Sequence, residues 1–261
     1  MLCQIGNNDN WSWWLNFVVL WAFFTVAGLL TMILFSGGLF IPYYVRPTFE
    51  RWVMKNNKQF PPALLVKKEI IHMCKGLVVA TLCPTFTIMA TRLSYPASLK
   101  DTRFGNSKGY CEGFDNNLKS TTALNTQSYL PGLEPMDLWK QALVIFFFTD
   151  LFEYAYHWCG HRFNLLWSVH KHHHMFFNPT PFAVIADEYL DQFVRTMPMV
   201  ILPWFMPINM DLLFGIFMTL FYGYGVYLHW GYETTLLTAH NPIFNTAYHH
   251  NIHHAKSSMN V

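Results

Sequence analysis

The sequence is poor in charged residues. Asp, Glu, Lys and Arg make up 12% of its 261 residues, against about 25% in soluble proteins. Hydrophobic side chains account for 52% and aromatic ones for 18%. This balance argues against a soluble globular protein and predicts a membrane protein. A net charge of +2, without a basic patch, also argues against a nucleic-acid-binding protein.

Paired cysteines are lacking as well. The five cysteines are scattered, without the spacing of a disulfide framework or of a thiolate metal site: Cys3, Cys74, Cys83, Cys111 and Cys159. Cys159 lies between two histidines, but its helical angle turns it away from their face, so we expect it to serve packing. The sequence shows no internal repeat and no low-complexity segment.

The sequence contains several long apolar runs. Residues 15–41 form an uncharged run of membrane-spanning length that follows three interfacial tryptophans. The run is too long for a signal peptide and lacks the basic start of one, so we expect a retained helix. Further runs occupy 76–91, 138–156, 193–206 and 212–228. Prolines separate the last two, which we expect to enter the membrane and return as a hairpin.

The charge pattern predicts which side of the membrane each segment faces. Basic residues outnumber acidic ones between 43 and 75, which places this segment in the cytosol by the positive-inside rule. Residues 93–135 are polar and rich in Ser, Asn, Gly and Pro, which favours a loop on the opposite side of the membrane. The run 138–156 then returns the chain to the cytosol. We therefore expect an all-α, multi-pass transmembrane helical bundle.

Three histidine clusters carry the expected chemistry. The first is His157-x3-His161, the second runs from His170 to His174, and the third from His249 to His254. At 100° per residue His157 and His161 stack one turn apart, and the second cluster shares one helix face except for His172. A lone buried histidine is more often a core residue than a ligand. Packing so many imidazoles without a cation, however, would bury polar nitrogens and repulsive charges together.

The number of histidines points to more than one ion. Neutral imidazole suits iron, copper and zinc. A single zinc needs four ligands, so eight or nine histidines exceed what a mononuclear site can use. The clusters therefore predict two metal ions that share the set. We expect this di-metal site in a histidine-rich cap on the cytosolic side of the bundle.

Two carboxylates precede the first cluster on the same apolar run. Glu153 lies one turn and Asp150 two turns before His157. Carboxylates in such a run usually face a bundle interior or a polar site. We expect them to accept hydrogen bonds from imidazole N–H groups. An ordinary charge pair with Arg162 or Lys140 is the alternative.

At these residues the sequence resembles the fatty acid hydroxylase and sterol desaturase superfamily, over roughly residues 137–256. Within it, the sterol C5-desaturases (lathosterol oxidases) are the most similar branch. They share a His-Lys-x-His-His cluster (170–174), a Pro-Thr-Pro-Phe-Ala segment (179–183), a lone histidine after a later apolar run (His229), and an Asn-x-Ala-x-His-His-x-x-His-His cluster (245–254).

The resemblance implies a four-helix membrane core, a non-haem di-iron centre and electrons from NAD(P)H through cytochrome b5 or a similar carrier. It implies residence in the endoplasmic reticulum membrane, with the histidines on the cytosolic side. Carried over by position, the metal ligands are His157, His161, His170, His173, His174, His229, His250, His253 and His254. His249 matches a family histidine expected to support the ligands rather than to bind metal.

The resemblance also implies a division of the chain. Residues 1–136 would be an N-terminal transmembrane region with the basic cytosolic segment and the lumenal loop, and residues 137–261 the catalytic domain. The chain stops seven residues after the last histidine of the third cluster, whereas relatives usually continue with a closing segment. A catalytic domain shortened at its C-terminus is therefore expected.

The expected function is an O2-dependent di-iron oxidoreductase that desaturates or hydroxylates a membrane lipid, with a sterol favoured. Two successive hydrogen abstractions give a double bond, whereas oxygen rebound gives a hydroxyl, and small differences in substrate position choose between them. A fatty acyl or sphingolipid hydroxylase, a C4-methyl sterol oxidase and a catalytically inactive lipid-binding relative remain alternatives. A membrane metal-binding or transport protein is the alternative of another class; transporters place ionisable ligands near the bilayer midplane, whereas these histidines lie beyond the apolar runs.

Overall fold

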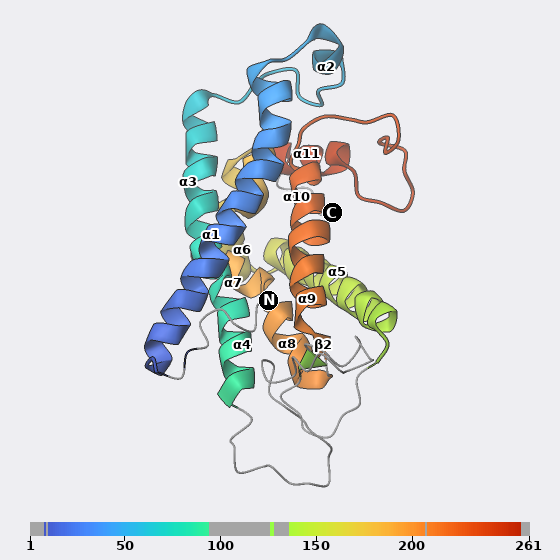
Figure 1. Ribbon diagram of the computed structural model, residues 1–261. Helices are drawn as coiled ribbons and strands as arrows, with labels where there is room; N and C mark the ends of the chain where they lie inside the picture. Colours follow the sequence, from blue (N-terminus) through green and yellow to red (C-terminus); the bar gives the residue numbers. More distant parts are fainter. Residues whose placement is uncertain (1–7, 9, 94–125, 128–135, 207, 257–261) are drawn as a thin grey trace.

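The computed structural model describes residues 8, 10–93, 126–127, 136–206 and 208–256. These residues are mostly helical, which confirms the all-α prediction (Figure 1). Strand β1 (Thr126–Gln127) pairs antiparallel with β2 (Ile208–Asn209) as a minor exception. Of the predicted loop 93–135, Leu93 ends helix α4, and residues 94–125 and 128–135 lie outside the described residues.

The N-terminal part is built from long helices. Ser12 caps α1 (Trp13–Phe40), because its hydroxyl accepts a hydrogen bond from the Leu15 N–H. The π-helical turn η2 (Ile41–Val45) extends this helix. The elements that follow are α2 (Phe49–Val53), α3 (Ala63–Ala80) and α4 (Leu82–Leu93).

The C-terminal part carries shorter elements around one long helix, α5 (Leu138–Arg162). They are α6 (Asn164–His170), the 3-10 helices η4 (His173–Met175) and η5 (Pro181–Ile185), α7 (Tyr189–Arg195), α8 (Pro198–Phe205), α9 (Met210–Ile216), the π-helical turn η6 (Phe217–Phe221), α10 (Tyr222–Leu228) and α11 (Ala247–Ala255).

Three helical stretches among the described residues are long and apolar enough to cross a membrane: Trp13–Val45, Ala63–Ala90 and Met210–Leu228. The first and third match the predicted runs 15–41 and 212–228. The second begins well before the predicted run 76–91, inside the segment read as basic and cytosolic. That segment forms a helix because α3 keeps its lysines exposed while it buries Met73 and Leu77 on the other side.

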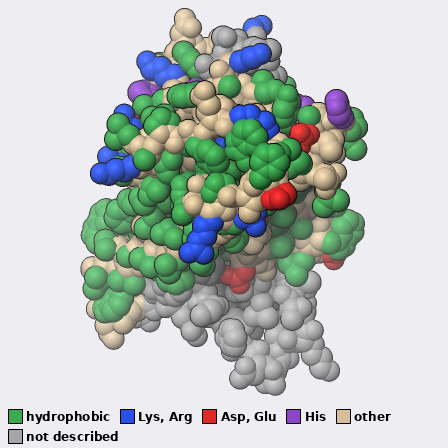
Figure 2. All heavy atoms as spheres, turned by 90° about the horizontal axis from the view of Figure 1, so that it is seen from above, with side chains coloured by type: hydrophobic (Ala, Val, Ile, Leu, Met, Phe, Trp, Pro, Cys, Tyr) green, Lys and Arg blue, Asp and Glu red, His purple; other side chains and the backbone are tan. Residues whose placement is uncertain are grey.

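The other predicted crossings differ. Helix α5 has 25 residues but is not among the three candidate spans, since charged residues interrupt its apolar run. Helix α8, in the run 193–206 that we expect to form one arm of a hairpin, has eight residues, fewer than the roughly 20 that a complete crossing needs. Seen from the end that carries α2 and α11, the surface is mainly hydrophobic with scattered Lys and Arg side chains (Figure 2).

Two hydrophobic clusters hold the helices together. One joins the first half of α1 to α4, α5, α8 and α9. The other joins the second half of α1 to α3, η5 and α10. All five residues of η5 are buried, so this short helix is a wedge between α3 and α10.

Two glycines allow the close approach of that wedge. A Cβ on Gly76 of α3 would lie 2.6 Å from the Ile185 carbonyl oxygen, and one on Gly225 of α10 would overlap the Val184 side chain. Each contact is closer than real Cβ atoms show. The chain continues from this wedge to Asp187, which contacts one of the histidines.

Candidate metal centre

The three histidine clusters converge in space. Eight histidines form two groups of four, and within each group the candidate ligand atoms lie within 4.8 Å of one another. The first group contains His157, His161, His170 and His174. The second group contains His173, His229, His250 and His254. The groups are adjacent, since the rings of His174 and His254 are 4.8 Å apart.

Local structure divides the second cluster between the two groups. The predicted single helix is wrong here, because α6 ends at His170 and the chain turns before it enters the 3-10 helix η4. Side chains three residues apart eclipse one another in a 3-10 helix, so this turn changes how successive residues point. The rings of His173 and His174 are inclined at 85°, and each serves a different group. His172 is half-exposed, with Nδ1 3.6 Å from Oε1 of Glu188.

Helix α11 supplies the third cluster, with Thr246 as its N-cap. His250 and His254 lie one turn apart and enter the second group. His253 points to the first group, where its Nε2 is 2.9 Å from the Nε2 of His157. All nine histidines carried over as ligands are therefore in the two groups or beside them. His249 is exposed and contacts Thr246 through its Nδ1 at 3.3 Å, which places it away from the nine.

The spacing of the nitrogens fits a bound cation. In the second group the Nε2 atom of His229 is 3.2 Å from that of His173, 3.0 Å from that of His250 and 3.2 Å from that of His254. The Nδ1 of His229 lies 2.7 Å from the Gly225 carbonyl oxygen and donates to it, which leaves its Nε2 unprotonated. Four nitrogens at about 2.0–2.1 Å around one ion would be about 3.3 Å apart in a tetrahedron. The group therefore has the dimensions of a metal site.

Burial keeps these imidazoles neutral. Burial, reinforced by His170, lowers the pKa of His161 to about 4. Burial also lowers the pKa of His229 to about 4 and those of His173, His250 and His254 well below the ordinary value. Their lone pairs are thus available at neutral pH, and neutral imidazole is the form that binds metal.

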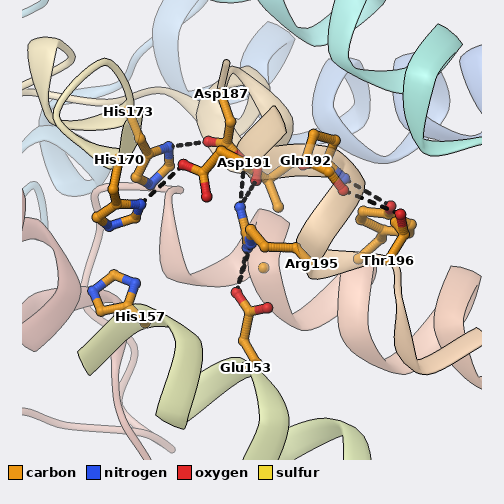
Figure 3. A network of polar contacts seen from close by, with 12 residues as sticks. Glu153, His157, His170, His173, Asp187, Asp191, Gln192, Arg195 and Thr196 are labelled. Atoms are coloured by element: carbon orange, nitrogen blue, oxygen red, sulfur yellow. Dashed lines mark hydrogen bonds and ion pairs between the residues drawn. The ribbon is translucent and has the colours of Figure 1, made fainter. Parts of the chain in front are cut away.

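Carboxylates orient one histidine of each group (Figure 3). The Nδ1 of His170 lies 3.0 Å from Asp191 Oδ2, and the Nδ1 of His173 lies 2.5 Å from Asp187 Oδ1. Both carboxylates are buried. A carboxylate at Nδ1 fixes the tautomer, leaves Nε2 free and makes the imidazole a stronger ligand. Each histidine group therefore has its own anionic support.

Arg195 ties Asp187 to α5. Its guanidinium pairs with Asp187 and with Glu153, whose Oε1 is 2.6 Å from Nη2. Burial alone would lower the pKa of Arg195, but the attraction of Glu153 and Asp187 raises it well above its ordinary value. The guanidinium is thus a fixed positive charge that holds η5, α5 and α7 together.

The carboxylates predicted from the sequence are placed differently. Asp150 is exposed on α5. Glu153 reaches His173 only through Arg195 and Asp187, and its charge partner is neither Arg162 nor Lys140. Sequence reasoning missed Asp187 and Asp191 as the direct partners. Their spacing of four residues, with Arg195 four further on, was the available signal.

The part of the chain that carries the histidines is similar to a known protein family. Residues 142–260, which contain all nine converging histidines, match the fatty acid hydroxylase family. The resemblance to this family that the histidine spacing predicts is thereby confirmed. No solved structure matches this chain.

Sterol desaturases are among the curated relatives. A Δ7-sterol 5(6)-desaturase of Gibberella zeae is 33% identical over 114 residues, which cover 43% of this chain and 31% of the relative. The lathosterol oxidase of Rattus norvegicus is 32% identical over 108 residues, which cover 41% and 36%. The human lathosterol oxidase is 31% identical over the same extent. These relatives confirm the predicted likeness to sterol C5-desaturases, although the chain spans only about a third of their length.

Proposed function

We propose that this chain is a membrane-bound non-haem di-iron oxidoreductase that desaturates or hydroxylates a lipid, with a sterol as the favoured substrate. The observation that carries the proposal is the pair of adjacent histidine groups, the first partly and the second fully buried, with Nε2 atoms that face one another in each. Its likeness to Δ7-sterol 5(6)-desaturase and lathosterol oxidase sequences favours sterol chemistry. Fatty acyl and sphingolipid hydroxylases and C4-methyl sterol oxidases remain the alternatives with the same site chemistry.

Each histidine group would hold one iron, with His253 as a ninth ligand beside the first group. Bound iron would supply the activation of O2 and the removal of hydrogen from an unactivated C–H bond. The protein's part is to hold neutral imidazoles in place. Asp191 and Asp187 orient His170 and His173, and burial excludes water from the second group.

The remaining parts of the proposal follow from the membrane setting. His229 directly follows the candidate span Met210–Leu228, which supports the proposal that a lipid reaches the site from the bilayer. Electrons would come from NAD(P)H through cytochrome b5 or a similar carrier. We propose the endoplasmic reticulum membrane as the location, with the histidine groups on the cytosolic side, in agreement with the basic segment that precedes α3.

Sterol analysis tests the proposal. The chain would be expressed in cells that lack their own sterol C5-desaturase, and sterols would be profiled by mass spectrometry. Three proteins would be compared: the unchanged chain, the variant His173→Ala, and the variant His172→Ala as a matched control from the same cluster. We expect a ring-B 5,6 double bond with the unchanged chain and with His172→Ala, and its loss with His173→Ala.

Iron content, measured on the same proteins, separates the other outcomes. Unchanged sterols in a protein that holds two irons would reject the sterol substrate and direct the search to acyl lipids. Folded protein that takes up no iron under anaerobic loading would reject the di-iron centre itself.

A further inference from the structure

A cavity of about 430 Å³ lies between the end of α1 with η2 and the start of α3. Its walls are largely apolar, with Phe40, Phe60, Val66 and Ile70 among the lining side chains. Of the described residues that line it, Lys67 carries the only charge. An apolar chamber with one cation suits an amphiphile with a negative head.

The position of the cavity suits a lipid. Two candidate spans meet there, since Trp13–Val45 ends and Ala63–Ala90 begins at this point. The side chains of Leu64 and Ile71 are exposed on α3 nearby. Figure 1 shows the adjoining ends of α1 and α3 beside the α2 segment. A phospholipid could contact two features here. Its tail would lie against the apolar surface at the end of the two spans, and its head group would lie next to the basic segment.

A buried charge adds to the positive potential. Lys55 is 1% exposed, and its Nζ lies 5.3 Å from the ring centre of Tyr44 and 5.6 Å from that of Phe60. Both rings also line the cavity. No carboxylate pairs with Lys55 among the residues that the structure describes, and its closest polar partner is Asn178 at 3.5 Å. Burial and Lys58 lower the pKa of Lys55 to about 8.

The carboxylate of α3 is not part of the cavity lining. Glu69 is fully buried and is not a lining residue. Its two carboxylate oxygens each lie 3.3 Å from the backbone N–H of Thr180, which donates to them. Glu69 is thus occupied at the η5 side of the helix, and the cavity keeps a positive lining.

We propose that this cavity binds an anionic glycerophospholipid, with an acyl chain against Phe40, Val66 and Ile70 and the phosphate on Lys67. The proposal concerns a site separate from the histidine groups and does not depend on which lipid they oxidise. It has one structural consequence for them. Tyr44, a wall of the cavity, places its hydroxyl 2.7 Å from the carbonyl of Trp230, the residue after His229. An occupied cavity would hold this tyrosine, and with it the chain beside His229.

Lipid binding to the purified full chain tests the proposal. Native mass spectrometry would compare dioleoyl phosphatidylserine with dioleoyl phosphatidylcholine, which differ in head-group charge but not in acyl chains. We expect the serine lipid to bind at least about five-fold more tightly, the effect of one lysine near an anionic surface. Equal affinity for the two lipids would overturn the proposal.

Three variants locate the site. Lys67→Gln removes the lining charge, Val66→Trp fills the apolar chamber, and Lys68→Gln is the control because this exposed neighbour does not line the cavity. We expect the first two to lose the preference and the third to keep it, with circular dichroism showing that all are folded. Equal losses in Lys67→Gln and Lys68→Gln, with Val66→Trp unaffected, would show diffuse surface attraction and refute the cavity site. Should one of the first two variants not fold, the other still decides between these outcomes.

Discussion

Asp187 should control how tightly the second histidine group holds metal. Its Oδ1 is 2.5 Å from His173 Nδ1, and its other oxygen pairs with Arg195. In Asp187→Asn the side chain keeps its shape but loses the negative charge that supports His173. Loss of such a partner typically lowers metal affinity 10- to 100-fold, or about 1.4–2.7 kcal/mol. The same change weakens one charge-assisted bond to Arg195, at about 1–3 kcal/mol of stability.

The assay separates these two effects. Apoprotein would be loaded with Fe(II) without oxygen and dialysed against a graded series of chelator, and bound iron would be measured by mass spectrometry. Glu188→Gln is the control, because this half-exposed residue contacts His172 outside the two groups. We expect Asp187→Asn to lose about one of two irons at a chelator strength that leaves the control loaded. Unchanged iron retention in a folded Asp187→Asn protein would refute the role of the carboxylate.

Three further predictions follow from the structure. Removing the metal with a chelator should lower the stability and with it the melting temperature. The loss of stability should be about 2.7 kcal/mol if the free metal was 100-fold above its dissociation constant, and thermal unfolding with and without Fe(II) measures it. Gly76→Ala should destabilise the fold by about 1–3 kcal/mol because its Cβ meets the Ile185 carbonyl, whereas Gly223→Ala, with only a contact to Phe35 at 3.7 Å, should be tolerated in the same melting assay. Lys55 loses its proton near pH 8 when folded but only near pH 10.5 when unfolded, so the unfolded state binds more protons between these values. Stability should therefore rise across that window, by at most about 3 kcal/mol; Lys55→Met should abolish the rise in denaturation measured from pH 7 to 10.5.

The sequence predicts best those parts of the candidate site that depend on the periodicity of a helix. A spacing of four residues places His157 and His161 on one face whatever the rest of the chain does. The same holds for His250 and His254. Length and composition likewise predict α1, because an uncharged apolar run of this length forms few structures other than a membrane-spanning helix. These features are local, and local features can be predicted from a single sequence.

Contacts between distant segments were harder to predict. The start of α3 was missed because its lysines dominate the charge count, although they occupy only the exposed side of the helix. Asp187 and Asp191 were missed as histidine partners because their role depends on how η5 and α7 pack against α6 and η4. Glu153 was assigned to imidazole because its position on α5 is close to His157 along the helix. Its actual partner, Arg195, comes from an element 42 residues away.

The second histidine group and the packing of the fold are linked through the η5 wedge. The wedge sits between Gly76 and Gly225, and Asp187 follows it by two residues, so the packing of α3 and α10 sets where this carboxylate lies. Helix α10 in turn ends at Leu228, directly before His229, whose Nδ1 donates a hydrogen bond to the Gly225 carbonyl oxygen. A change that moves the wedge should therefore displace both the support of His173 and the position of His229. In such a protein a packing mutation far from any ligand can weaken metal binding, because the same contacts that bury η5 also align the second histidine group.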